Sequence, residues 1–222
     1  MKIKDISLEF LGHSGFVIEY QNKRIAIDPY NTSENLEKVD VILISHSHHD
    51  HCSIKDIEKL SKKGTLIIIP ADAQSKINKI SDVEMQVVSP DEEIMLFEKI
   101  KVKIVPAYNI NKKFHPKSEG WFGFVIKLND TIIYHSGDSD NIPEMHSISG
   151  HSKHNNFLIT LLPVSGTYVM TAEEAAEVAS FLKPDLAIPM HFGSGVGTKE
   201  DAESFVKLCE KEGIKSQILN KI

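Results

Sequence analysis

Residues 46–51 carry the densest group of side chains that could bind a metal ion. They read His-Ser-His-His-Asp-His and directly follow the apolar run 41–45. His46 and His48 are two residues apart, so at a strand end both can project to the same side. A turn must then bring Asp50 and His51 back to a common point. Imidazoles combined with a carboxylate favour zinc, iron or manganese over calcium or magnesium. The alternative is a polar loop that is rich in histidine by chance.

Three further polar stretches follow predicted strands. They are the long loop 107–121, which contains His115, the turn around Asp138, and His191. Strand ends on one side of a sheet sandwich can converge on one cleft, so these residues are candidates for the same site. Alternatives remain for two of them, because Asp138 could be a turn residue that bonds its own backbone, and His191 could be a buried structural histidine.

Strands and helices that could position these residues follow from hydrophobic patterns and capping residues. Ser53 and Thr198 are expected to cap helices, and Thr171 with Glu174 forms a capping-box pattern for a third; a short helix is expected at 71–77. The grouping of strands and helices predicts an α/β fold, with two sheets face to face and helices outside, in a single domain over residues 1–222. Strands are expected at 7–10, 16–20, 24–28, 41–45, 66–69, 84–88, 94–97, 100–106, 122–128, 131–135, 157–162, 186–190 and 216–219.

Composition limits the classes of partner. The net charge is −6 and only one of 25 basic residues, Arg24, is an arginine, which argues against nucleic-acid and membrane-surface binding. The first residues show no apolar signal region, and no apolar run is long enough to span a bilayer. Two cysteines give no disulfide framework. We therefore expect a cytoplasmic protein that acts on a small molecule; the oligomeric state stays open, a homo-oligomer included.

Several motifs in order resemble the metallo-β-lactamase fold superfamily, and within it the UlaG-like, UPF0173-type metal-dependent hydrolases. The resemblance covers nearly the whole chain and implies an αββα sandwich of two mixed β-sheets with helices on the outer faces. The motif at 46–51 is the most specific feature. The others are Leu11-Gly12-His13-Ser14, Ile27-Asp28-Pro29, Tyr134-His135-Ser136-Gly137-Asp138 and Pro189-Met190-His191-Phe192-Gly193.

The resemblance implies a centre of two divalent ions, with zinc expected and manganese, iron or nickel as alternatives. His46 and His48 would bind the first ion, and Asp50 and His51 the second. Asp138 would bridge the two ions, and His191 would complete the second site.

One position departs from the superfamily pattern. The remaining histidine of the first site usually stands in an Ala-x-His setting, whereas this chain has Ala107-Tyr108-Asn109. His115 is the predicted replacement; Asn109 as a weak oxygen ligand and an open first site are the alternatives. Asp28 is a candidate for orienting a ligating imidazole.

Other residues have more ordinary interpretations. His13 and His135 are expected beside the ligands, His49 in solvent or in packing contacts, and Cys52 as a small buried side chain. Lys112, Lys113 and Lys117 could form a lip that attracts anions, or simply a solvated loop. Tyr108, Tyr168 and Ser165 are candidates for substrate contact. The polar stretch with His146, His151 and His154 is expected to be exposed.

The expected function is hydrolysis by a metal-bound hydroxide, with Asp50 also orienting the water or accepting its proton. The bond would be of ester type, in a lactone or a phosphoester, and the loop lysines suggest an anionic substrate. Alternatives are a nuclease or phosphodiesterase of the same fold, a di-iron redox protein, and a metal-dependent sensor without turnover. Fold alone does not decide among these.

Overall fold

The computed structural model describes residues 1–150 and 156–222 and divides the chain into two compact units. Unit 1 contains residues 1–89 and 219–222, and unit 2 contains residues 90–218. The prediction that they make up one domain stays a prediction. Among the described helices, none is long and apolar enough to cross a membrane. His151 and His154, which were expected to be exposed, lie outside the described residues.

Unit 1 contains a seven-stranded sheet whose strand order follows the sequence. Its first four strands are antiparallel and the last four, β4 to β7, are parallel. Gln21 and Asn22 both have positive φ, 48° and 62°, which is the geometry of a tight hairpin turn between β3 and β4. The strands are β1 (Lys2–Ile3), β2 (Ile6–Gly12), β3 (Gly15–Tyr20), β4 (Lys23–Ile27), β5 (Val41–Leu43), β6 (Thr65–Ile69) and β7 (Val83–Val87).

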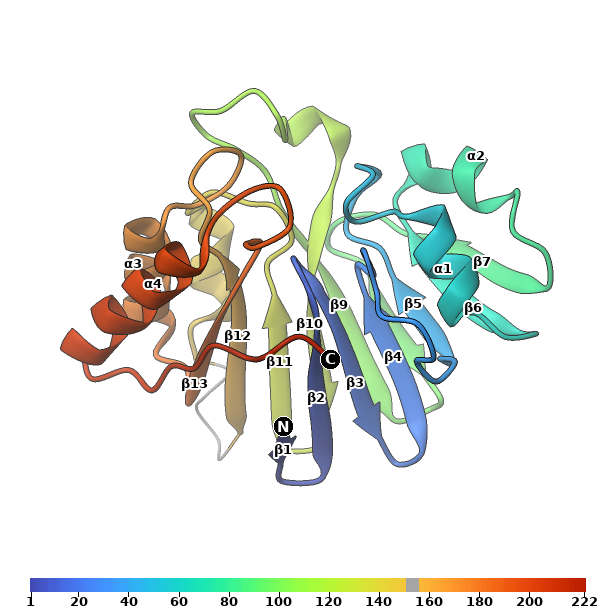
Figure 1. Ribbon diagram of the computed structural model, residues 1–222, viewed down its shortest axis with the longest axis horizontal. Coiled ribbons are helices and arrows are strands. Elements are labelled where there is room, and N and C mark those ends of the chain that lie inside the picture. The colour runs from blue at the N-terminus through green and yellow to red at the C-terminus, as the bar shows by residue number, and fades with distance from the viewer. Residues whose placement is uncertain (151–155) are drawn as a thin grey trace. The chain divides into compact units, whose positions relative to one another are not determined.

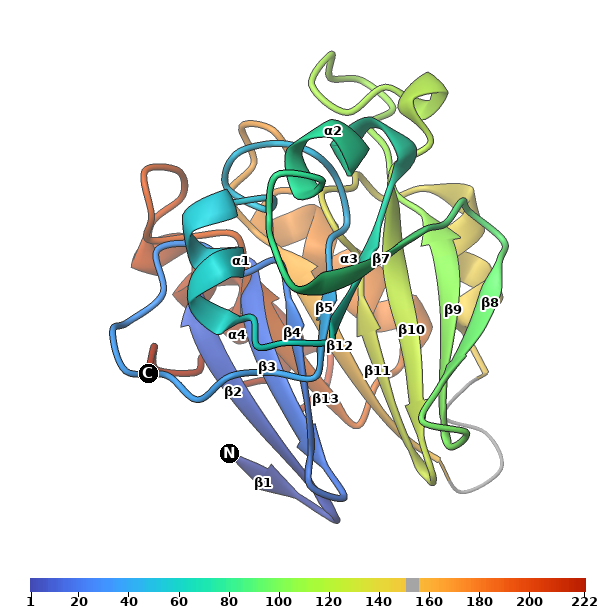
Figure 2. The same cartoon turned by 90° about the vertical axis from the view of Figure 1, so that its right-hand side faces the viewer.

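Two helices, α1 (Ile54–Leu60) and α2 (Gln74–Ile77), lie beside the parallel strands of this sheet (Figure 2). Ile57 and Leu60 of α1 pack into a core with Ile42 of β5 and Ile67 of β6. The predicted cap is confirmed, because the Ser53 side chain accepts a hydrogen bond from the backbone of Asp56. The core thereby fixes the ends of β4 and β5, where the candidate site residues of unit 1 begin.

Unit 2 contains a six-stranded sheet in the order β13-β12-β11-β10-β9-β8. Strands β8 to β11 are antiparallel, and β11, β12 and β13 run parallel. The ends of β11 and β13 therefore lie at the same edge of the sheet. The strands are β8 (Glu93–Leu96), β9 (Ile100–Pro106), β10 (Phe122–Leu128), β11 (Thr131–His135), β12 (Phe157–Pro163) and β13 (Leu186–Met190).

Helices α3 (Ala172–Leu182) and α4 (Lys199–Lys211) lie side by side along β12 and β13 (Figure 1). Both begin with the predicted caps: Thr171 pairs with Glu174, and Thr198 pairs with Asp201. Alanines on the buried side of α3 let its backbone approach its neighbours closely.

Some local predictions were wrong. Residues 216–219 do not form a strand, because only Ser216 makes a single bridge to Ala187. A 3₁₀ helix at Pro143–Ile148 was not predicted, and it buries Met145 and Ile148, so the start of the polar stretch is not wholly exposed. His146 itself is exposed and stacks on Phe181, with ring centroids 4.2 Å apart.

Candidate metal centre

In unit 1 the motif after β5 forms a tight turn that gathers its imidazoles. The carbonyl oxygen of His48 accepts hydrogen bonds from the backbone N–H of His51 at 3.1 Å and of Cys52 at 2.8 Å. The ring centroids of His46 and His51 are 4.0 Å apart, and those of His46 and His48 are 4.8 Å apart. We call His46, His48, Asp50 and His51 the N-terminal set. Rings this close disfavour a second positive charge, so neutral imidazoles suit the arrangement.

Asp28, at the end of β4, anchors two of these rings. Its Oδ2 lies 2.8 Å from Nδ1 of His51 and also accepts a hydrogen bond from the Ser45 hydroxyl at 2.5 Å. Since the Ser45 proton is directed to Asp28, Ser45 Oγ accepts from Nδ1 of His46 at 2.9 Å. Both rings therefore carry their proton on Nδ1 and present the lone pair of Nε2, which is the form that binds a metal. Ligand atoms of Asp28, His46 and His51 lie within 4.8 Å of one another, but the Asp28 carboxylate faces the Nδ1 side of the rings.

Asp50 lies next to the predicted neighbour His13. Its Oδ2 is 3.0 Å from Nε2 of His13 and 3.8 Å from Nε2 of His51. His13 is fully buried, whereas Asp50 is partly exposed. Of the two alternatives for His49, solvent holds, because its side chain is 85% exposed.

In unit 2, three residues meet at the sheet edge and the loop 107–121. Nε2 of His115 lies 3.3 Å, and Nε2 of His191 lies 3.0 Å, from Oδ2 of Asp138. All three side chains are buried. Asp138 follows β11 and His191 follows β13, so the parallel strands bring them to one edge. We call His115, Asp138 and His191 the C-terminal set.

The hydrogen bonds of His115 indicate which of its nitrogens has the lone pair. Its Nδ1 lies 3.1 Å from Oδ1 of Asn109 and 3.2 Å from the carbonyl oxygen of Tyr168, and both of these atoms accept. Nδ1 therefore donates, and Nε2 faces the Asp138 carboxylate. Either a proton on Nε2 or a metal ion bound to both atoms satisfies this contact. The C-terminal set thus fits a divalent ion by the chemistry of its donors.

Strained backbone accompanies the candidate residues. His13, Asp28 and His191 have φ values of 55°, 41° and 60°. Non-glycine residues in this region cost about 1–2 kcal/mol each relative to ordinary backbone. Each of the three stands at a strand end or turn, where the strain directs a side chain that regular structure would point elsewhere.

His135 differs from the ligand candidates. Its Nδ1 accepts a hydrogen bond from the backbone N–H of Gly137 at 3.1 Å, so its proton sits on Nε2. It is fully buried at the end of β11. This tautomer suits a residue that supports the turn carrying Asp138.

The loop lysines are largely balanced by carboxylates. Lys112 Nζ lies 2.6 Å from Asp140, and Lys117 Nζ lies 2.7 Å from Glu144. Hydrogen bonding to Glu144 raises the pKa of Lys117. Tyr108 also donates its hydroxyl to Glu144 at 2.8 Å. The predicted anion-attracting lip is therefore weakened, and Tyr108 and Lys117 act first as partners of Glu144.

Apolar side chains are more prominent at this loop than its sequence suggested. Phe114, directly before His115, is 49% exposed and packs edge-on against the ring of Tyr168, with centroids 4.5 Å apart. Ile110 is also exposed. The surface next to His115 is thus partly aromatic.

Sequence reasoning did not identify the roles of Ser45, Ser165 and Asp140. Ser165 Oγ lies 2.8 Å from Nδ1 of His191, and Ser45 Oγ lies 2.9 Å from Nδ1 of His46. Asp140 is buried and bonds to the loop that carries His115. The available signal was position, since Ser45 precedes the histidine motif and Asp140 follows Asp138 by two residues.

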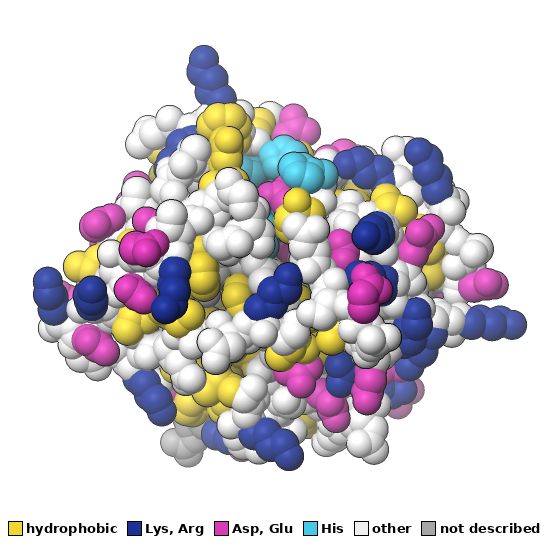
Figure 3. All heavy atoms as spheres, in the orientation of Figure 1, with side chains coloured by type: hydrophobic (Ala, Val, Ile, Leu, Met, Phe, Trp, Pro, Cys, Tyr) yellow, Lys and Arg dark blue, Asp and Glu magenta, His cyan; other side chains and the backbone are white. Residues whose placement is uncertain are grey.

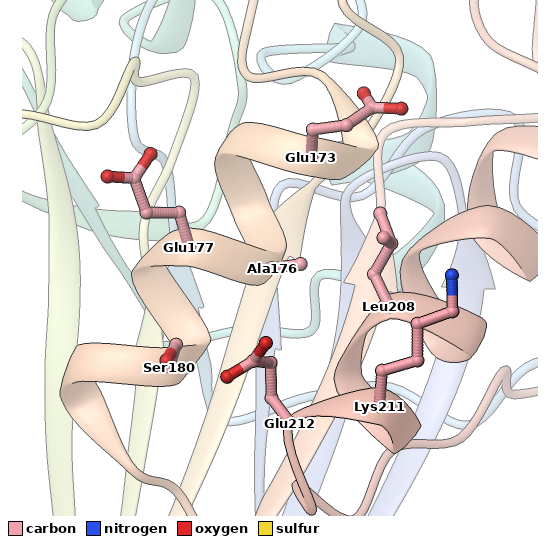
Figure 4. Close-up of a pocket in the computed structure, with 7 residues that line it drawn as sticks. All are labelled: Glu173, Ala176, Glu177, Ser180, Leu208, Lys211 and Glu212. Atoms are coloured by element: carbon pink, nitrogen blue, oxygen red, sulfur yellow. The ribbon is translucent and has the colours of Figure 1, made fainter.

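Other features do not belong to these sets. Cys52 is buried as expected, and burial raises the pKa of its thiol to about 11, which makes it a poor nucleophile. A cavity of about 300 Å³ between α3 and α4 contains no residue of either set (Figure 4). The cavity is lined by Glu173, Ala176, Glu177, Ser180, Leu208, Lys211 and Glu212.

On the face drawn in Figure 3, lysine and arginine side chains are interspersed with acidic ones.

Comparisons with known proteins agree with this chemistry. Residues 7–191 match the family model described as a β-lactamase superfamily domain. A UPF0173 metal-dependent hydrolase of Nanoarchaeum equitans is 32% identical over 97% of both chains. The structure of a candidate metal-dependent hydrolase from Parabacteroides distasonis superposes with a TM-score of 0.83 at 27% identity, over 97% of this chain and 94% of that one. A metallo-β-lactamase fold protein of Bacillus subtilis, 14% identical over 95% and 90% of the two chains, shares the fold with a TM-score of 0.67. These likenesses confirm the predicted fold class.

Proposed function

The chain belongs to the metallo-β-lactamase superfamily as a metal-dependent hydrolase, and we propose that it cleaves an ester-type bond of a small molecule with two divalent metal ions. His46, His48 and His115 would hold one ion, and Asp50, His51 and His191 the other. Asp138 would be shared by both. Zinc is the proposed metal because imidazole nitrogens dominate the donors.

The observation that carries the proposal is the same in both ligand sets. Nδ1 of His51 lies 2.8 Å from the Asp28 carboxylate, and Nδ1 of His115 lies 3.1 Å from Asn109 Oδ1. Each ring is thereby fixed with Nε2 as the donor. This arrangement of an acceptor behind each ring is typical of metal-binding histidines and raises their basicity.

Divalent ions bound by these residues would lower the pKa of water and stabilise the charge that develops on the substrate oxygen. The protein itself supplies a candidate proton acceptor in Asp50, which is partly exposed. His13, 3.0 Å away, holds one oxygen of that carboxylate in place. We assign orientation of the attacking water, or acceptance of its proton, to Asp50.

The choice of substrate rests on the loop 107–121. Paired lysines leave less support for a strongly anionic substrate than the sequence suggested, although Lys113 is exposed. Phe114 and Tyr168 offer an aromatic surface next to His115. A lactone or a mono-anionic phosphoester with an apolar group fits this combination better than a polyanion.

The test is a substrate panel on protein of measured metal content. We expect hydrolysis of a lactone or a phosphodiester that carries an aromatic group. Phe114→Ala should raise KM more than it lowers kcat. Ser118→Ala, an exposed and uncharged change in the same loop, is the matched control. Zinc-loaded protein that cleaves neither ester class would overturn the proposed bond type, and preferred cleavage of RNA would favour the nuclease alternative.

A further inference from the structure

Asn109 is buried in the loop before β10, and both ends of its amide are engaged. Its Oδ1 lies 3.0 Å from the backbone nitrogen of His115 and 3.1 Å from Nδ1 of the same residue. Its Nδ2 lies 2.9 Å from the carbonyl oxygen of Tyr168 and 3.2 Å from Oδ1 of Asp140. One side chain therefore connects His115 to two other parts of unit 2.

The orientation of this amide is determined by its neighbours. The Tyr168 carbonyl and the Asp140 carboxylate can only accept hydrogen bonds, so the NH₂ group must face them. Asp140 is itself held, because it accepts from the backbone of Ile110 at 2.8 Å and from Lys112 at 2.6 Å. The Asn109 oxygen is left facing His115.

The Asn109 oxygen accepts from two N–H groups of His115, one of the backbone and one of the ring. Its two lone pairs are thereby occupied, which leaves none directed at a metal. The ring proton is fixed on Nδ1, and Nε2 points to Asp138 Oδ2, 3.3 Å away.

We propose that Asn109 is a positioning residue and not a ligand: oriented by Asp140, it fixes the tautomer and the ring direction of His115, so that Nε2 is offered to the metal beside Asp138. This inference rests on the proposed function, because it requires His115 to bind the metal. It gives Asn109 and Asp140 a role in orienting His115, which a list of the metal-binding residues alone does not show.

A double-mutant cycle on zinc affinity tests the assignment, with affinity measured by competition with a chelator. Asn109→Leu keeps the size of the side chain and removes the acceptor. We expect it to weaken zinc binding by about 10- to 100-fold in the wild-type background, and by no more than about twofold in the His115→Ala background. Lys113→Ala, an exposed change in the same loop, is expected to have no effect.

A second variant at the same position separates positioning from a general loosening of the loop. Asn109→Asp keeps an acceptor oxygen facing His115, which Asn109→Leu lacks, but loses the NH₂ group that faces the Tyr168 carbonyl. We expect Asn109→Asp to retain clearly more zinc affinity than Asn109→Leu, while thermal unfolding confirms that all variants are folded.

The outcomes are distinguishable. Unchanged zinc affinity in Asn109→Leu, or an equal loss in the His115→Ala background, would overturn the positioning role and leave the proposed function standing. Zinc affinity in folded Asn109→Asp that is no higher than in Asn109→Leu would also count against positioning. Unchanged affinity in His115→Ala alone would remove His115 from the metal site and overturn both.

Discussion

Oδ2 of Asp28 lies 2.8 Å from Nδ1 of His51, and both side chains are fully buried. The same carboxylate accepts from the backbone and hydroxyl of Ser45, which in turn accepts from His46. Asp28 thus orients two imidazoles of the N-terminal set at once. Replacing Asp28 should therefore change metal affinity and the stability of the fold, even though Asp28 has no proposed contact with substrate.

Asp28→Asn places an NH₂ group where the carboxylate had only acceptors, so at least one donor of Ser45 or His51 loses its partner. We expect zinc affinity to fall by about 10- to 100-fold, and the free energy of unfolding to fall by about 1–3 kcal/mol. Chelator competition and urea unfolding measure the two effects.

Asp56→Asn is the matched control. Asp56 is also a buried carboxylate, and it accepts hydrogen bonds from Asn31, Thr32 and Ser53. Asp56→Asn should lower the free energy of unfolding by a similar amount without changing zinc affinity. Equal zinc affinity in both variants would show that Asp28 only supports the fold.

Asp56 also predicts how stability depends on pH. Burial alone would raise the pKa of Asp56, but hydrogen bonds from Ser53, Thr32 and Asn31 hold it below its ordinary value. Its contribution is therefore present above the unfolded pKa of about 3.9 and is lost as the pH falls through the folded pKa. Urea unfolding between about pH 6 and pH 3 should show the difference between wild type and Asp56→Asn shrinking toward the acid end. A difference that grows on acidification would contradict this sign.

The sequence predicted features that depend on residues close together in the chain better than features that depend on residues far apart in it. Local signals were sufficient for the caps Ser53, Thr171 and Thr198 and for the strands of both sheets except the two-residue β1, because a pattern or a single hydrogen bond defines each. The prediction of a strand at 216–219 was wrong. It rested on a local alternation of apolar residues, but a strand also needs pairing, and here the pairing with β13 is limited to one bridge at Ser216.

The site was less predictable in its supporting residues than in its candidate ligands. The histidine motif is readable from its spacing, and the position of His115 could be proposed from the chain. The role of Asn109 could not, because it depends on Asp140 and Tyr168, which lie 31 and 59 residues away. The pairing of Lys117 with Glu144 is likewise non-local and changed the expected charge of the loop.

Gly123 of β10 tests how the sheet places Asp138. A Cβ atom there would overlap the carbonyl oxygen of His135 and lie 2.7 Å from the carbonyl carbon of Ser136. Gly123→Ala should therefore displace the turn that carries Asp138, lowering zinc affinity and costing about 1–3 kcal/mol of stability.

Gly64 provides the comparison for this change. It has a φ of +82° and no atom within 4 Å of an added Cβ, so Gly64→Ala introduces backbone strain without a clash. Thermal unfolding should show a loss of about 1–2 kcal/mol for this variant, with zinc binding unchanged. If Gly123→Ala kept full zinc affinity, the turn would not depend on the close approach of β10.

The two cysteines should be unreactive toward thiol reagents in the folded protein. Both are buried, and burial raises the pKa of the Cys52 and Cys209 thiols to about 11. A thiol reagent at neutral pH should label neither until urea unfolds the chain, when both should react. Rapid labelling of Cys52 in native protein would require a thiolate beside the histidine motif and would contradict its assignment as a packing residue.

The most direct test of the account is the metal content of purified, zinc-reconstituted protein, measured for wild type, His115→Ala and Asp28→Asn, with ester hydrolysis assayed on the same samples. We predict close to two zinc ions per chain in wild type, fewer in both variants, and activity that falls with the metal. One ion or none in active wild-type protein, or two ions retained by both variants, would contradict the proposed two-metal function.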